Sequence, residues 1–241
     1  MDESEIAERM LDGRRPEVLV VHAGWRKARA LGLACEPFAE ALMARAGTLL
    51  MPAMTWRTVN AASPVFDELA TPGHVGALAE VFRLKYSTQR SLHVTHSVAG
   101  AGPLCRALLS THLFGDTPVA ANSPYGLMRN YDTWILLVEC GLESCTALHH
   151  PEEVMAPEVY VNAAPDDVDY RLIDRHGREH RQRMRRHVRV LRDFPKFGGP
   201  AHALEVGPGQ PPLAFRLIEL KALMRTVFEA LVEDPRATLA A

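Results

Sequence analysis

The chain has 241 residues, 47% of them hydrophobic, which is enough to bury a substantial core. Its 27 basic and 29 acidic residues nearly cancel, so composition argues against a nucleic-acid partner and against docking on an anionic membrane. No basic leader opens the chain, and no apolar stretch reaches the roughly twenty residues that a membrane span needs. We expect a cytoplasmic protein with a single domain over residues 1–241.

The four cysteines are scattered and form no CxxC pair, so the usual spacing of a zinc site or a redox dithiol is missing. Cys145 lies four residues before His149 and is conceivable as a nucleophile. A cysteine in an apolar run more often packs in the core, so we expect reduced, buried and inert thiols.

The N-terminal part predicts a parallel strand–helix–strand unit. Apolar runs at 17–21 and 48–51 predict strands, and helical spacing at 37–46 predicts the helix between them. The first run ends at His22-Ala23-Gly24, so this strand should lead into a flexible loop that suits ligand binding.

The later elements are predicted in the same way. We expect a surface loop at 55–73, helices at 74–84 and 102–112, a strand and loop at 90–99, turns at 118–125, a buried strand at 133–140, antiparallel strands at 159–162 and 170–174 with a hairpin turn at 175–178, and one or more closing helices at 213–231.

Residues 171–192 concentrate arginine and histidine. Such a stretch could attract a polyphosphate or an acidic carrier protein. The alternative is a solvated surface whose charges have no specific partner.

The segment 148–152 carries the clearest candidate chemistry. A neutral imidazole of His149 or His150 can accept a proton near neutral pH, and the carboxylate of Glu152 can fix its tautomer and raise its basicity. Zinc ligation and a purely structural role are the alternatives, although the spacing matches no HExxH pattern.

A second polar cluster spans Arg90 to Ser97. If this segment is a strand, Ser91, His93 and Thr95 share one face. That face could bind the polar arm of a ligand while Arg90 contacts a phosphate or a carboxylate. A hydrogen-bonded strand edge without a ligand is the alternative.

The turn from His22 to Trp25 is a third candidate, because its backbone N–H groups could cradle a pantetheine amide or a phosphate. Other tight strand-to-helix turns have a similar pattern, so the turn alone is a weak signal.

In their order along the chain, these motifs resemble the aminoglycoside 3-N-acetyltransferase family. The resemblance rests on His22-Ala23-Gly24, Gly47 to Pro52, Phe66-Asp67, Thr71-Pro72, Gly76, Arg90 to Ser97 with Ala99 and Gly102, Ser123 to Leu127, Thr146 to Glu152 and Gly199 to Ala201.

The resemblance implies an α/β fold, a three-layer α/β/α sandwich with a mixed central sheet. It implies an acyltransferase that moves an acetyl or other acyl group from acetyl-CoA or another acyl-CoA to a small-molecule amine, without a metal. His149 would be the general base and Glu152 its carboxylate. An acyl carrier protein is an alternative donor, and a homodimer is left open.

The resemblance also suggests binding residues. For the donor they are His22, Ala23, Gly24, Trp25, Arg90, Ser91, His93, Ser97, Ser123 and Tyr125. For the acceptor they are Asp67, His96 and His150. Loop N–H groups near Gly24 and the hydroxyls of Ser97 and Ser123 are candidates to stabilise an oxyanion.

Three departures from the family pattern narrow the expectation. Ala23-Gly24 replaces the usual Ser-Ser pair, and Pro151 replaces an alanine in the His–Glu signature. The segment 53–65 is short and lacks the acidic residues of the family's acceptor loop, which weakens attraction for a polycationic sugar. We therefore expect a biosynthetic transferase. The alternatives are aminoglycoside resistance, a thioester-consuming cyclase or hydrolase, and an inactive binding relative.

Overall fold

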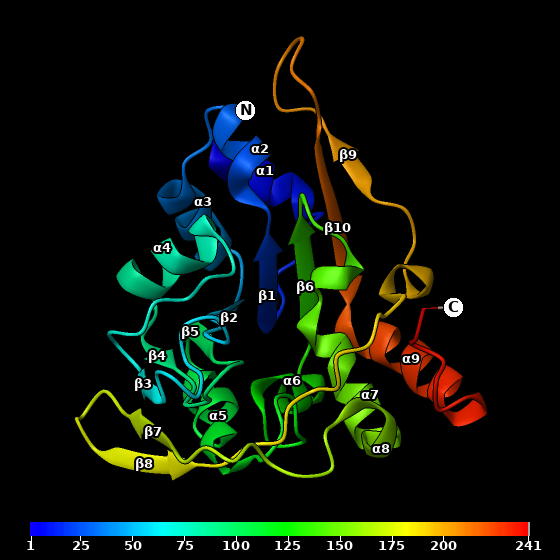
Figure 1. Ribbon diagram of the computed structural model, residues 1–241. Coiled ribbons are helices and arrows are strands. Elements are labelled where there is room, and N and C mark those ends of the chain that lie inside the picture. Colours follow the sequence, from blue (N-terminus) through cyan, green and yellow to red (C-terminus); the bar gives the residue numbers. More distant parts are fainter. Residues whose placement is uncertain (241) are drawn as a thin grey trace.

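The computed structural model describes residues 1–240. Seven strands form the main sheet: β1 Val18–Ala23, β2 Thr48–Pro52, β4 Gln89–Arg90, β5 Val98–Ala101, β6 Thr133–Val138, β9 His202–Leu204 and β10 Leu213–Glu219. Their order is β4-β5-β2-β1-β6-β10-β9 (Figure 1). The central strand β1 is parallel to β2 and β6, and the outer pairs are antiparallel, so the sheet is mixed.

Alternate residues of β1 pack on opposite faces of this sheet. Leu19 and Val21 belong to one core cluster, whereas Val18 and Val20 belong to another. Helices α1 Glu3–Met10, α2 Trp25–Ala30, α3 Cys35–Met43 and α4 Ala77–Lys85 cover the first face. Helices α5 Cys105–Leu109, α6 Pro124–Leu127 and α9 Leu220–Glu233 cover the second, and α7 His149–Met155 packs on α9. Apolar residues on both sides of buried strands thus give the expected three-layer sandwich.

A smaller sheet lies beside the main one. Its strands are β3 Val65–Asp67, β7 Tyr170–Ile173 and β8 Glu179–Gln182, in the order β3-β7-β8 (Figure 1). It has its own core, formed by Val59, Phe66, Val94, Tyr170, Leu172 and Met184. This sheet brings the segment after β8 back across the C-terminal ends of the central strands.

Several predicted elements are confirmed, namely the parallel β1–α3–β2 unit, α4, β6 and the hairpin turn at 175–178. That turn joins β7 to β8, so the strand predicted at 159–162 is wrong. Pro157 instead begins the short helix α8 Pro157–Tyr160, since proline suits a first helical turn.

Three further predictions need correction. Residues 213–219 are strand β10, paired with β6, and only Leu220–Glu233 is helical. The helix expected at 102–112 is confined to α5, followed by a 3-10 turn at His112–Phe114. The loop at 55–73 contains β3, and its Val59 and Phe66 are buried rather than on the surface.

No helix in residues 1–240 combines the length and apolar character required to cross a membrane.

Candidate active site

A cavity of about 430 Å³ lies where β1, β2 and β6 end. Parallel strands bring their carboxyl ends to one edge of a sheet, which is the usual place for a ligand in this fold class. The lining consists of Val21, His22, Ala23, Gly24, Pro52, Met54, Trp56, Val75, Ala79, His96, Cys140, Glu143, Ser144, Thr146 and His149.

The turn at Ala23-Gly24 is packed too closely for a side chain at Gly24. A Cβ at this glycine would lie 2.6 Å from the carbonyl oxygen of Glu139, which has a positive φ of 52°. The Gly24 N–H donates to Val138 O at 2.8 Å. It is therefore not free for an oxyanion, contrary to our expectation for this atom.

His149 and Glu152 form a directed pair. Nδ1 of His149 lies 2.8 Å from Oε2 of Glu152, and the imidazole also lines the cavity. Because a carboxylate only accepts hydrogen bonds, Nδ1 carries the proton and Nε2 is left as the basic nitrogen.

Pro151 does not disturb this pair. It occupies the first turn of α7, where a backbone N–H has no intrahelical acceptor, so the missing donor costs nothing there. His149 and Glu152 are three residues apart and lie on the same side of the helix.

Glu152 is fully buried and held by two further groups. Arg192 Nε donates to both carboxylate oxygens, at 3.0 and 3.2 Å, and the Thr238 hydroxyl donates to Oε1. Burial alone would raise the pKa of Glu152, but the hydrogen bond from His149 and the charges of His149 and Arg192 outweigh it and lower the pKa. The carboxylate is therefore ionised and fixed in orientation.

The neighbouring Glu153 belongs to a different network. It accepts from the Thr117 hydroxyl and from Val119 N, and Oε1 lies 2.7 Å from Nε2 of His187. Burial raises the pKa of Glu153 to about 7 and keeps the pKa of His187 well below its usual value. The His187 ring contacts His149, with ring centroids 4.6 Å apart.

His22 and His96, both expected at the binding site, line the cavity. Burial lowers the pKa of His22 to about 4 and holds the pKa of His96 well below 6.5. Both rings are therefore neutral near pH 7. The His96 ring also lies 5.5 Å from that of His187, centroid to centroid.

The Arg90 cluster is used inside the protein. Arg90 is 2% exposed and donates to Ser97 Oγ and to the carbonyl oxygens of Glu68, Thr71 and Ala53. Its guanidinium thus ties together the loop after β2 and the chain before β5. These bonds favour a structural role over the phosphate contact that we expected.

The strand expected for Ser91, His93 and Thr95 is wrong, because a turn follows Arg90. Nδ1 of His93 accepts the backbone N–H groups of Thr95 and His96, at 3.2 and 3.0 Å. Ser91 Oγ lies 2.9 Å from Nδ1 of His112. The polar groups of this segment thus bond one another in place of a sheet neighbour.

The remaining predicted residues lie outside the cavity lining. Trp25 packs against Phe38, Asp67 accepts from the N–H groups of Leu69 and Ala70, Ser97 bonds Ala53 O, Ser123 caps α6, Tyr125 is buried in the second-face core, and His150 faces Val119 O. Neither Ser97 nor Ser123 points a hydroxyl at the cavity, whereas Ser144 and Thr146 line it.

Sequence reasoning missed several residues of the site. His187 and Arg192 lie in the basic stretch, where they bond Glu153 and Glu152 instead of facing a partner. Thr238 reaches Glu152 from the C-terminal segment. Trp56 was detectable only as an aromatic in the short loop after β2.

Residues 1–240 contain no cluster of three or more histidine, cysteine, aspartate or glutamate side chains arranged to hold a metal ion.

Comparison with known proteins gives a consistent result. A family model described as aminoglycoside 3-N-acetyltransferase matches residues 20–207. The YokD protein from Bacillus subtilis gives a TM-score of 0.75 at 18% identity, covering 97% of this chain and 99% of that one. Aminoglycoside acetyltransferase AAC(3)-IVa gives 0.74 at 23%, covering 100% and 92%, and AAC-IIIb, solved with CoASH, gives 0.74 at 17%, covering 97% of each. These structural likenesses establish the same fold.

Proposed function

This chain belongs to the aminoglycoside 3-N-acetyltransferase family, whose co-substrate is acetyl-CoA, and from that premise we propose that it acetylates a small-molecule amine with His149 as general base. The observation that carries the proposal is the 2.8 Å contact between His149 Nδ1 and the ionised, buried Glu152 at the cavity wall. A base held in this way by a carboxylate is the arrangement that proton transfer from an attacking amine needs.

The chemistry is a direct transfer. The acceptor nitrogen attacks the thioester carbonyl and forms a C–N bond, while Nε2 of His149 takes the proton that nitrogen loses. The tetrahedral adduct then collapses, the C–S bond breaks, and the imidazolium returns its proton to the departing thiolate. Glu152 stabilises the imidazolium through Nδ1 and does not itself change protonation, because its pKa is lowered.

The negative charge on the adduct oxygen needs donors. Ser144 and Thr146 line the cavity in the segment directly before His149, so their hydroxyls are our candidates. They replace the atoms near Gly24, Ser97 and Ser123, whose hydrogen bonds are made within the protein.

Acetyl-CoA is favoured over a carrier protein as donor. In the basic stretch 171–192 every arginine except Arg183 and Arg189 forms an ion pair within residues 1–240. Those pairs reduce the positive field that an acidic carrier would require. A donor switch to a carrier would be recognised by a rate that falls steeply with added salt.

We place the reaction in a biosynthetic pathway rather than in resistance to antibiotics. Printed descriptions of related structures name a gentamicin, apramycin and sisomicin as ligands of those proteins. In this chain the only acidic residue in the cavity lining is Glu143, so a polycationic sugar would find little counter-charge.

The test is CoA release, measured with a thiol reagent, for wild type and His149→Ala. We expect amine-dependent release with acetyl-CoA and a fall in kcat of about 10²- to 10⁴-fold in the variant. His150→Ala is the matched control, because that ring bonds Val119 O and faces away from the cavity. Equal rates for wild type and His149→Ala would contradict the assignment of the base.

A further inference from the structure

A second cavity, of about 190 Å³, adjoins the first and shares Trp56 and His96 with it. The rest of its lining is Thr95, Pro118, Met184, Arg186, His187 and Arg189. Because His187 lies against His149, a molecule in this second cavity would reach the base from the side opposite Gly24. Two substrates that react directly need two such approaches.

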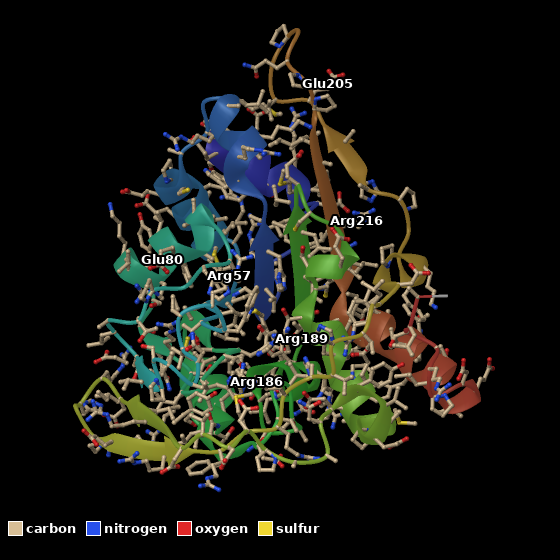
Figure 2. The ribbon with its side chains drawn as sticks, viewed as in Figure 1. Arg57, Glu80, Arg186, Arg189, Glu205 and Arg216 are labelled. Atoms are coloured by element: carbon tan, nitrogen blue, oxygen red, sulfur yellow. The ribbon has the colours of Figure 1, made fainter. Side chains whose placement is uncertain are left out.

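The second cavity is bordered by positive charge. Arg189 is exposed and makes no hydrogen bond or ion pair within residues 1–240. The Arg57 guanidinium lies 4.9 Å from the Trp56 ring centroid and likewise has no acidic partner in that part of the chain. Arg186, by contrast, is neutralised by Asp166. Figure 2 shows these three arginines around the front of the molecule, below the central strands.

Neighbouring groups do not cancel this charge. His96 and His187 stay neutral, and Glu153 is shared with His187 and buried behind it. Glu143 belongs to the larger cavity and accepts the N–H of Gly141 at 2.9 Å. Arg57 and Arg189 thus leave the entrance of the second cavity with a net positive charge.

We propose that the acceptor, given the amine acetylation proposed above, is a small amine that also carries an anionic group, a carboxylate or a phosphate, held by Arg57 and Arg189. A guanidinium offers two parallel donors to such a group, which fixes the amine in one orientation toward His149. A polycationic acceptor would meet two unpaired like charges at the same place.

The same arginines could in principle meet the phosphates of CoA, and the experiment separates these sources. Acceptor KM is measured for two matched pairs, 4-aminobutyrate with 4-aminobutyramide and glucosamine 6-phosphate with glucosamine, and for gentamicin. Each is tested with acetyl-CoA and with S-acetylpantetheine, which lacks the nucleotide phosphates. The proteins are wild type, Arg189→Ala, Arg57→Ala, the double variant, and Arg183→Ala as an exposed control that borders neither cavity.

We expect the anionic member of each pair to be preferred, with its KM raised about three- to five-fold by either single variant and further by both. The neutral member and the Arg183→Ala control should not change, and the preference should weaken with salt. Equal use of both members, a preference for gentamicin, or an effect seen only with acetyl-CoA would overturn the acceptor assignment while leaving the acetylation itself in place. No amine-dependent CoA release with any acceptor would instead contradict the proposed function, and the acceptor assignment with it.

Discussion

Glu152→Gln is the sharpest probe of the proposed base. The wild-type carboxylate accepts from His149 and Arg192 on one oxygen and from Thr238 and Arg192 on the other. The amide has a single acceptor oxygen. The Thr238 hydroxyl can turn to accept from the new NH2 group, so the amide oxygen can still face His149. The variant then keeps the His149 tautomer and loses the charge.

That loss has a calculable size. A carboxylate whose charge centre is about 4 Å from an imidazolium stabilises it by on the order of 4 kcal/mol at an effective dielectric constant near 20. Since about 1.4 kcal/mol corresponds to a factor of ten in rate, we expect kcat to fall by about 10²- to 10³-fold. KM for acetyl-CoA should change little, because Glu152 is fully buried and lies outside the cavity lining.

Stability changes as well, since Arg192 loses its counter-charge. Its side chain is 12% exposed, so unfolding free energy should fall by about 3 kcal/mol. Glu153→Gln is the matched control: it is the next residue on α7, it is equally enclosed, and glutamine resembles the protonated form that a pKa of about 7 half populates. Its kcat should stay within about threefold of wild type.

The assay is steady-state CoA release at fixed temperature, with urea unfolding of both variants to correct for folded fraction. If Glu152→Gln retains kcat within about threefold of wild type, or if Glu153→Gln loses as much, the reasoning on Glu152 is refuted.

Three other outcomes are expected. Burial raises the pKa of Glu153 from 4.5 to about 7, so its favourable contribution is complete below pH 4.5 and is lost as pH rises through 7; Glu153→Gln should therefore lose up to roughly 3 kcal/mol less than wild type between pH 5 and 8, and parallel urea curves would be inconsistent with this. Burial raises the pKa of Cys145 to about 12, so Cys145→Ala should keep kcat/KM within about twofold, a claim that inactivation of wild type by alkylation at that thiol would overturn. Gly24→Ser should cost about 1–3 kcal/mol because of the Glu139 carbonyl, whereas Ala23→Ser should cost less than about 0.5 kcal/mol, and similar melting temperatures for both would refute the contact argument.

The central scaffold was predictable because its signals are local. The apolar runs at 17–21, 48–51 and 133–140 are strands β1, β2 and β6, and the turn at His22 leads into the cavity. Strand β10 was not predictable: Leu213–Glu219 has no turn residue to separate it from α9, and only its pairing with β6 makes it a strand.

The site was predictable only where its residues are close in sequence. His149 and Glu152 share one helical turn, so their contact follows from spacing. Arg192 and Thr238 reach Glu152 across 40 and 86 residues, and no local pattern announces such contacts. Arg90 shows the opposite error, since a polar cluster that satisfies its own hydrogen bonds has the same composition as one that binds a ligand.

The segment around Thr238 has a consequence for biosynthesis of the protein. Thr238 donates to Glu152, and its carbonyl accepts from Asp193 N, next to Arg192. The support of the proposed base is therefore complete only after residue 238 has emerged from the ribosome, although His149 and the central strands emerge much earlier. A nascent chain can assemble the cavity before this point, but it would hold Glu152 without one of its donors and would acquire full activity only at the end of translation.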